Sequence, residues 1–278
     1  MHAPVERTLP TAETTPPLVQ PASRPLRAWR LLRLAWVLLW GGLTALLVFP
    51  FTSPRGRQRL RQRWSVSLLH SVGVRLRHRG HSPEAGCMLV ANHISWLDIF
   101  VINALTPAAF VSKAEVRQWP LIGWLAARND TVFLMRGSRG HARIVNGRIA
   151  ALLDAGTHVA VFPEGTTTDG SQVLHFHAAL LQPAIACGHP VQPLALRYHD
   201  ASGLRSQAPA YVGDTSLLAS LLTIVSARGL VADCTVHAPL PTGNGTHRRD
   251  LATQARDAII QSVTAQAPDC GTGQESHS

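Results

Sequence analysis

Hydrophobic and polar positions follow three different patterns along the chain. Residues 1–25 combine six prolines with threonine and alanine and show no apolar periodicity, which is typical of a disordered leader. The next segment contains an apolar run from Leu34 to Pro54, LAWVLLWGGLTALLVFPFTSP, with no ionisable side chain in 21 residues. A helix of about 20 such residues is long enough to cross a bilayer. The pattern therefore predicts a membrane-embedded helical segment near the N-terminus.

Short β-rich runs alternate with helical runs beyond this segment, from Cys87 to His237. This alternation predicts an α/β fold in which helices flank a central mixed sheet. The predicted strands are 88–91, 109–112, 131–134, 158–162, 191–198 and 234–238. The predicted helices are 97–105, 141–153, 178–186, 216–225 and 248–265. We divide the chain into a leader (1–25), a membrane-anchoring basic and apolar segment (26–80), an α/β domain (81–240), and a C-terminal helix with a disordered tail (241–278).

Charge supports the membrane assignment. The chain has 26 Lys and Arg against 16 Asp and Glu, a formal net charge of +10, and Lys113 is its only lysine. Arginines flank the apolar run on both sides, at positions 24, 27, 30, 33, 55, 57, 59, 61 and 63. Anionic headgroups attract such flanks, whereas a cleaved signal peptide or a buried core helix would not carry them. Spanning and re-entrant insertion both stay open, and the charges favour a hairpin that returns both ends to the cytoplasmic face.

Cysteine and histidine spacing gives little support to metal or disulfide chemistry. The four cysteines lie far apart without a C-x-x-C pair, which argues against a disulfide scaffold and a zinc ribbon. His175 and His177 form an H-x-H pair that would need a third ligand, and no other metal spacing accompanies it. We expect no metal site.

Candidate catalytic residues gather at the predicted strand ends. His93 follows the strand 88–91, and Asp98 lies five residues later at the start of a helix. A tight turn would let the Asp98 carboxylate fix the His93 tautomer and leave the second ring nitrogen free to accept a proton. The alternative is a surface histidine beside an unrelated helix-start aspartate. Ser95 lacks a G-x-S-x-G elbow and fits a helix cap better than a nucleophile. Pro193, inside an apolar strand, indicates a sheet edge or a bulge.

Four segments together resemble a known enzyme family. The segments are NHISWLD at 92–98, VFLMR at 132–136, FPEGT at 162–166 and VQPLAL at 191–196. Their types and order resemble the blocks of the glycerolipid acyltransferases, the family that includes 1-acyl-glycerol-3-phosphate acyltransferase. The resemblance implies an acyltransferase α/β domain preceded by a membrane-embedded helical motif.

The resemblance also implies roles for single residues. His93 would be the general base that deprotonates the acceptor hydroxyl, and Asp98 would orient and stabilise it. Arg136 would hold an anionic group of the acceptor. The remaining substrate-binding candidates shape the acceptor pocket or lie along the substrate path, and they are Glu164, Gly165, Thr166 and Lys113. A plain solvated lysine is an equal interpretation of Lys113.

The resemblance implies a lysolipid acceptor and an acyl-CoA or acyl carrier protein donor, with no cofactor. The leading expectation is transfer to 1-acyl-sn-glycerol 3-phosphate at the inner (cytoplasmic) membrane, with the active site facing the cytoplasm. Two departures remove features that would touch a phosphate: Thr167 follows FPEGT, and the later block reads Phe176-His177-Ala178-Ala179. FPEGTTTDG also resembles the lyso-ornithine lipid acyltransferases, which supply the alternative acceptor. A thioesterase and a basic membrane-anchored binding protein are further alternatives, although the arginines do not interleave with aromatics as in nucleic-acid binders.

Overall fold

Strands of the protein form one sheet with the order β1-β7-β6-β2-β5-β3-β4. A computed structural model describes residues 21–118, 123, 128, 131–134, 139–243 and 245–265. The strands of this described part are β1 (Arg75–Gly80), β2 (Met88–Ala91), β3 (Ala108–Lys113), β4 (Val132–Leu134), β5 (His158–Val161), β6 (Val191–His199) and β7 (Val231–Val236). Only the β6–β7 pair is antiparallel among the strand pairs of this sheet, so the predicted mixed sheet is confirmed.

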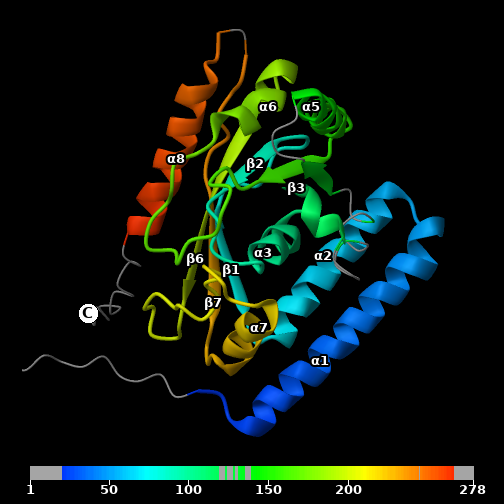
Figure 1. Ribbon diagram of the computed structural model, residues 1–278, viewed down its shortest axis with the longest axis vertical. Coiled ribbons are helices and arrows are strands. Elements are labelled where there is room, and N and C mark those ends of the chain that lie inside the picture. The colour runs from blue at the N-terminus through cyan, green and yellow to red at the C-terminus, as the bar shows by residue number, and fades with distance from the viewer. Residues whose placement is uncertain are drawn as a thin grey trace, which may run out of the picture.

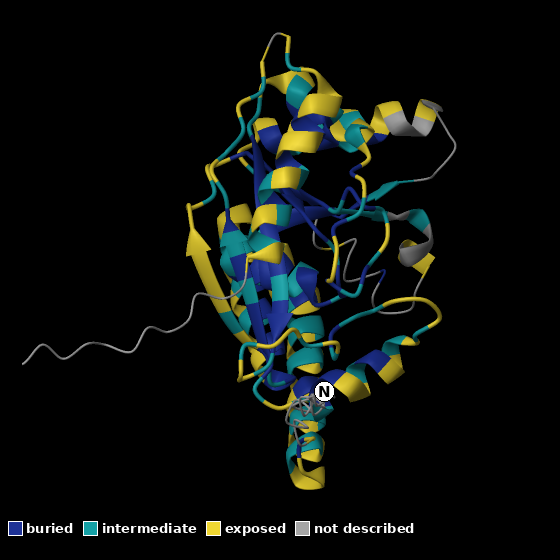
Figure 2. Cartoon of the chain, turned by 90° about the vertical axis from the view of Figure 1, so that its left-hand side faces the viewer, coloured by how far each residue is buried: buried dark blue, intermediate teal, exposed yellow. Residues whose placement is uncertain are grey.

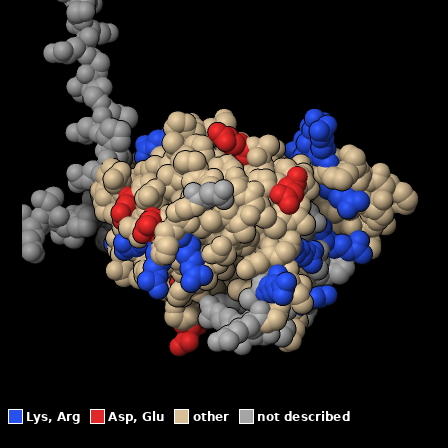
Figure 3. Space-filling view, turned by 90° about the horizontal axis from the view of Figure 1, so that it is seen from above, with Lys and Arg blue, Asp and Glu red and all other residues tan. Residues whose placement is uncertain are grey.

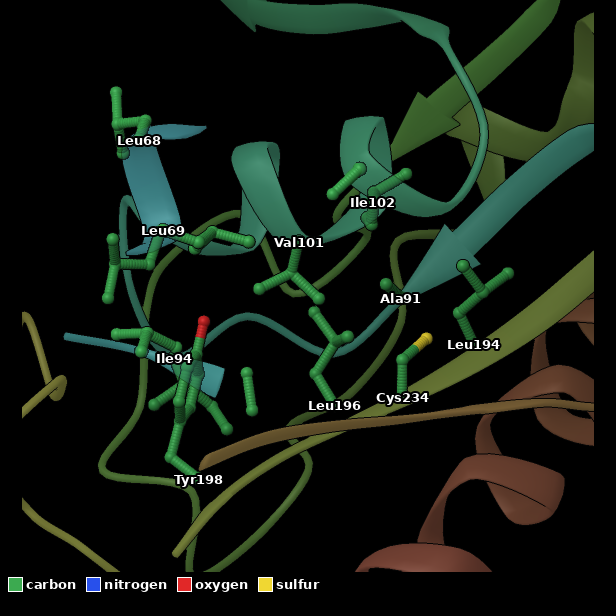
Figure 4. Packing of buried hydrophobic residues seen from close by; sticks show 14 of the residues in the cluster. Leu68, Leu69, Ala91, Ile94, Val101, Ile102, Leu194, Leu196, Tyr198 and Cys234 are labelled. Carbon is green, nitrogen blue, oxygen red and sulfur yellow. The ribbon is translucent and has the colours of Figure 1, made fainter. Parts of the chain in front are cut away.

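Alternating side chains of the sheet enter two separate cores. In β2, Met88 and Val90 join one core, while Leu89 and Ala91 join the other, because successive side chains of a strand point to opposite faces. The first core is covered by α5 (Arg139–Asp154), α6 (Gln182–Cys187) and α8 (Arg248–Thr264). The second core is covered by α2 (Pro54–Ser71), α3 (Asp98–Leu105) and α7 (Leu217–Ser226). The result is a three-layer α/β/α arrangement (Figure 1), and Figure 4 shows the second core.

Helix α2 of the second layer also forms a helical hairpin with α1 (Arg24–Leu43), which lies on the outside of that layer. Helix α1 continues through a π-helical segment (Thr44–Val48) and a 3₁₀ turn (Phe49–Phe51), and the chain then reverses into α2. The two helices lie side by side at one edge of the molecule (Figure 1). The indole Nε1 of Trp64 donates to the carbonyl oxygen of Val37 at 2.8 Å, directly beside Gly41. A Cβ at Gly41 would lie 2.2 Å from the Trp64 indole, so only glycine permits this approach of α1 to α2.

The outer face of the hairpin is apolar and exposed. The stretch Arg24–Phe51 is long and apolar enough to cross a membrane, and only 17% of its most apolar window is buried by the rest of the protein. Large apolar side chains are exposed along it, including Trp29, Leu32, Trp36, Leu39, Trp40, Leu46, Leu47 and Phe51. Basic side chains gather on the side of the molecule where α1 turns into α2 (right in Figure 3). Such a patch flanked by arginines is typical of a membrane-interaction surface.

Two predicted segment boundaries differ from the structure. Helix α1 begins at Arg24, so it starts two residues inside the predicted leader; residues 1–20 and 266–278 lie outside the described ranges. Strand β1 pairs with β7 and belongs to the sheet, although it fell within the predicted anchoring segment 26–80. Its sequence, RLRHRG, lacks the alternation of a half-buried strand because β1 is an exposed edge strand (yellow arrow at the left of Figure 2).

Pro193 does not lie at a sheet edge, so that part of the interpretation is wrong. The predicted bulge is present opposite it, because the antiparallel pairing shifts by one residue between Leu194–Val236 and Val191–Leu240. Strand β6 lies between β7 and β2, and its register with β2 continues without interruption from Val191 to Leu194. The carbonyl oxygen of Pro193 accepts a hydrogen bond from the backbone N–H of His237 at 3.0 Å. The donor that proline lacks is replaced by the Gln192 side chain, whose Nε2 donates to the His237 carbonyl oxygen at 3.0 Å. A neighbouring side chain thus makes proline acceptable inside the sheet.

Replacing Trp36 and Trp40 together by glutamate should weaken membrane binding. Both side chains are more than 60% exposed on the outer face of α1, so the change should leave the fold intact. Each substitution removes about 1.5–3 kcal/mol of free energy that burial of the tryptophan side chain in the membrane would contribute. We therefore expect at least a tenfold loss in partitioning to vesicles that contain anionic lipid. Ile144→Glu, at an exposed apolar position of α5, is the matched control. Unchanged co-sedimentation of the double variant with vesicles would exclude this face as the contact.

Candidate active site

Asn92 fixes the end of β2 and thereby the position of the next residue, His93. The Asn92 side chain donates from Nδ2 to the carbonyl oxygen of Leu196 at 3.0 Å, and its Oδ1 accepts from the Leu196 backbone N–H at 2.7 Å. The amide is fully buried and replaces the backbone pairing where β2 stops beside β6. His93 therefore leaves the sheet at a fixed point of its carboxyl-terminal edge.

His93 and Asp98 form the predicted pair. The ring nitrogen Nδ1 of His93 lies 2.8 Å from Oδ2 of Asp98, which is completely buried at the start of α3. The same carboxylate oxygen accepts from the backbone N–H groups of Ile94 at 2.7 Å and Ser95 at 2.9 Å. Because an ionised carboxylate only accepts hydrogen bonds, Nδ1 of His93 carries its proton and Nε2 is left with a free lone pair.

The His93 ring is held by stacking and stays partly open to solvent. It lies against the Phe162 ring with centroids 3.9 Å apart and an angle of 11° between the planes. The His93 side chain keeps 20% of its exposure, and no hydrogen-bond partner of Nε2 lies within the part of the chain that the structure describes. A substrate hydroxyl can therefore reach Nε2, and the ring itself cannot rotate freely.

Glu164 follows β5, the parallel neighbour of β2, and binds the backbone of His93. Its Oε1 accepts from the backbone N–H of His93 at 2.7 Å, and its Oε2 accepts from the N–H of Leu174 at 2.8 Å. Only 4% of Glu164 is exposed, and this burial raises the pKa of its carboxyl group above the ordinary value, against the lowering effect of the two N–H donors. With both oxygens occupied, Glu164 shapes the site by fixing the backbone of His93.

The other predicted binding residues lie along the same edge of the sheet or outside the described residues. Gly165 has a φ of +69°, and its N–H donates to the Phe162 carbonyl oxygen at 3.1 Å, which closes the turn after β5. Thr166 is exposed beside it. Lys113 ends β3 and pairs with Leu134 of β4. Arg136 lies outside the described residues, so its predicted anion contact stays a prediction.

Ser95 belongs to the turn between His93 and Asp98. Its Oγ accepts from the Leu97 N–H at 3.3 Å, and its carbonyl oxygen accepts from the Asp98 N–H at 3.1 Å. This fully buried hydroxyl closes the turn before α3, whereas the N-cap position of α3 belongs to Leu97. His175 and His177 lie edge to face at 6.2 Å, and the described residues contain no group of three His, Cys, Asp or Glu arranged around a metal.

Sequence reasoning missed three residues that support the dyad. Tyr198, on β6, donates its hydroxyl to Oδ1 of Asp98 at 2.7 Å. Thr168 donates its backbone N–H to the His93 carbonyl oxygen at 2.8 Å. Arg256 of α8 donates to the carbonyl oxygens of Val173 and Leu174 and so holds the segment that Glu164 binds. None of these contacts follows a local spacing, so no sequence signal could have identified them.

The fold and the site define an α/β protein with a buried carboxylate–histidine pair at the carboxyl-terminal edge of parallel strands. The family model described as "Acyltransferase" matches residues 73–197. A lyso-ornithine lipid O-acyltransferase of Pseudomonas aeruginosa is 39% identical over 225 residues, covering 81% of this chain and 84% of that protein. The chain therefore belongs to the acyltransferase family, and it is an enzyme of lipid biosynthesis.

Two further proteins are similar to this chain. A 1-acyl-sn-glycerol-3-phosphate acyltransferase of Neisseria gonorrhoeae is 37% identical over 179 residues, covering 64% of this chain and 70% of that protein. The crystal structure of the 1-acyl-sn-glycerophosphate acyltransferase PlsC from Thermotoga maritima superposes with a TM-score of 0.65 at 20% identity, covering 86% of this chain and 93% of that one. The second likeness establishes the fold.

Glu164→Gln should lower both stability and activity. Glutamine keeps the shape but turns one acceptor into an NH₂ group, which leaves the N–H of His93 or Leu174 buried without a partner. Such a loss costs about 1–3 kcal/mol, which we expect as a lower urea midpoint together with a reduced kcat. Glu84→Gln, at an exposed position, is the matched control. Wild-type stability and turnover of Glu164→Gln would contradict this role of Glu164.

Proposed function

We propose that this protein is a membrane-bound O-acyltransferase that moves a fatty acyl group from a thioester donor to the free hydroxyl of a lyso-ornithine lipid. The observation that carries the chemistry is the His93 ring, with Nδ1 bound to a buried carboxylate and Nε2 open. Acyl transfer from a thioester needs a base for the hydroxyl proton and an acid for the leaving thiolate, and one imidazole serves both steps.

The proposed reaction proceeds without an acyl-enzyme. Nε2 of His93 takes the proton as the acceptor oxygen attacks the thioester carbonyl, and Asp98 stabilises the imidazolium that forms. When the tetrahedral intermediate collapses, the carbon–sulfur bond breaks and the thiolate receives the proton from Nε2. The products are a two-chain lipid and the free thiol of coenzyme A or acyl carrier protein. Both donors are anionic, in keeping with the net charge of +10.

A pair of opposite charges beside the site supports the lyso-ornithine acceptor. Asp169 follows Thr168, whose N–H binds the His93 carbonyl oxygen. Oδ1 of Asp169 accepts from the N–H of Ser171 at 2.9 Å, and Ser171 holds the pKa of this carboxyl group below its usual range. Its Oδ2 lies 3.9 Å from the guanidinium of Arg205, and both side chains are well exposed.

An exposed ion pair at 3.9 Å contributes little to stability, so a ligand can separate it at small cost. An ornithine headgroup carries an ammonium group and a carboxylate, which complement Asp169 and Arg205. A phosphomonoester would meet repulsion from Asp169. The Pseudomonas relative named for this acceptor also covers 81% of the chain, against 64% for the Neisseria relative.

The second candidate acceptor is 1-acyl-sn-glycerol 3-phosphate. The observation in its favour is the 37% identity to the Neisseria enzyme named for this substrate. Arg136 would be the residue that holds the phosphate. For either acceptor, we propose that the apolar face of α1 places the enzyme on the inner membrane with the site facing the cytoplasm, where thioester donors are made.

His93→Ala should abolish acyl transfer while leaving fold and membrane binding unchanged. Loss of the base should lower kcat by about 10²–10⁴-fold. The assay uses purified protein with labelled acyl-CoA and lysolipid. His78→Ala, on the exposed edge strand β1, is the control. If His93→Ala keeps its turnover within tenfold of the wild type, His93 is not the base. Free fatty acid as the main wild-type product would instead identify a thioesterase.

Asp169→Asn should lower kcat/KM for lyso-ornithine lipid by about tenfold, which is the contribution of one charged contact. The kcat/KM for lysophosphatidate should stay unchanged or increase. The measurement compares both acceptors in the same mixed micelles, for the wild type and the variant. Asp214→Asn, exposed in the same surface region before α7, is the control. A wild-type preference for lysophosphatidate of more than tenfold would make the second candidate the function.

A further inference from the structure

The buried hydroxyl group of Tyr198 needs a hydrogen-bond acceptor, and that acceptor is the carboxylate of Asp98. The side chain belongs to β6, beside β2 in the sheet, and only 3% of it is exposed. Its hydroxyl donates to Oδ1 of Asp98 at 2.7 Å. We propose that Tyr198 is a positioning residue of the acyltransferase reaction, which sets the orientation and the proton affinity of the His93–Asp98 dyad through Asp98. This inference rests on the proposed role of the dyad.

The hydrogen bonds of Asp98 divide unequally between its two oxygens. Oδ2 receives three donors, from His93, Ile94 and Ser95, all within six residues of chain. Oδ1 receives Tyr198, which is 100 residues away in sequence. Since Asp98 is completely buried, water cannot replace a lost donor at Oδ1. The tyrosine hydroxyl therefore fixes the rotation of the carboxylate that presents Oδ2 to the imidazole.

The surroundings keep Tyr198 in its donor form. Burial, followed by the charge of Asp98 and the hydrogen bond to it, raises the pKa of the Tyr198 phenol well above its ordinary value. The ring packs in the second core, where Figure 4 shows it against Ile94. A phenylalanine would fill the same space, so Tyr198→Phe removes the hydroxyl and little else.

Two other titratable groups face the dyad, and neither is replaced in this variant. Glu164 faces it from the loop after β5, and Cys234 faces it from β7. Burial raises the pKa of the Cys234 thiol to about 12, so it stays neutral. Asp233, the next residue, is bound to His199 at 2.7 Å. A change in the titration of the dyad in Tyr198→Phe would therefore come from the lost hydroxyl.

The direction of that change follows from the charge. Without the donor at Oδ1, the ionised carboxylate is less stabilised and attracts protons more strongly, so the dyad takes up its second proton at higher pH. The acid limb of kcat/KM against pH should move upward by about one pH unit, the effect of one hydrogen bond to a charged group. The loss should appear in kcat, with the KM for the acceptor nearly unchanged.

The chain offers a matched control, because it contains only two tyrosines. Tyr211 lies near the site but bonds there through its backbone, to Ile94 and Thr167. Tyr211→Phe should keep the wild-type pH profile. In the Tyr211→Phe background, global incorporation of 3-fluorotyrosine labels Tyr198 alone and makes it a stronger donor without altering the fold. The acid limb should then move to lower pH, opposite to Tyr198→Phe.

A double-mutant cycle separates this inference from the dyad itself. Asp98→Ala should lose most of the activity, and adding Tyr198→Phe should cost nothing further, because Tyr198 acts through Asp98. A uniform loss at every pH in Tyr198→Phe, or additive losses in the cycle, would overturn the positioning role and leave the dyad standing. Wild-type activity of Asp98→Ala would overturn the dyad, and this inference with it.

Discussion

The Asp98 carboxylate is the point on which the rest of the site depends. It accepts four hydrogen bonds in a fully buried position: one from His93, two from the turn that follows His93, and one from a distant strand. A buried charge is tolerated only when its lone pairs are satisfied. The donors that stabilise the buried carboxylate of Asp98 also fix the turn from His93 to Ser95. The conformation of this turn and the orientation of the imidazole therefore depend on the same hydrogen bonds.

Local periodicity could predict most of the fold and the local half of the site. Strands such as β2 and β5 and the helices behind them were predicted within a few residues, because their apolar patterns reflect burial in two cores. Strand β1 was missed because an exposed edge carries no such pattern. The pairing of His93 with Asp98 could be predicted, because one turn of chain joins the two residues. The contact of Tyr198 with Asp98 could not be predicted, since it depends on β6 lying beside β2, and no local sequence pattern indicates that strand order.

Helix α2 connects α1, the exposed apolar helix, to the layer that contains Asp98. On one side of α2, Trp64 forms a hydrogen bond with α1. On the other side, a polar side chain of α2 caps the end of α3. Nε2 of Gln62 donates to the carbonyl oxygens of Ala104 and Leu105, at 3.1 and 3.0 Å. Helix α3 begins with Asp98, so a continuous set of contacts runs from α1 to the dyad. This gives the hairpin a definite position relative to His93.

That connection matters for the proposed reaction, because its two substrates would come from different solvents. The acceptor would keep its acyl chain in the bilayer and present a hydroxyl near the surface, whereas the thioester donor would be delivered from water by an anionic carrier. An enzyme that only collided with membranes would have to extract the acceptor, at about 0.8 kcal/mol for each methylene that leaves the lipid. In the proposed function, a rigid hairpin that rests in the interface would avoid this cost by bringing His93 to the hydroxyl. The exposed tryptophans of α1 and the buried carboxylate at the start of α3 would then serve one requirement, which is to hold His93 at a fixed depth.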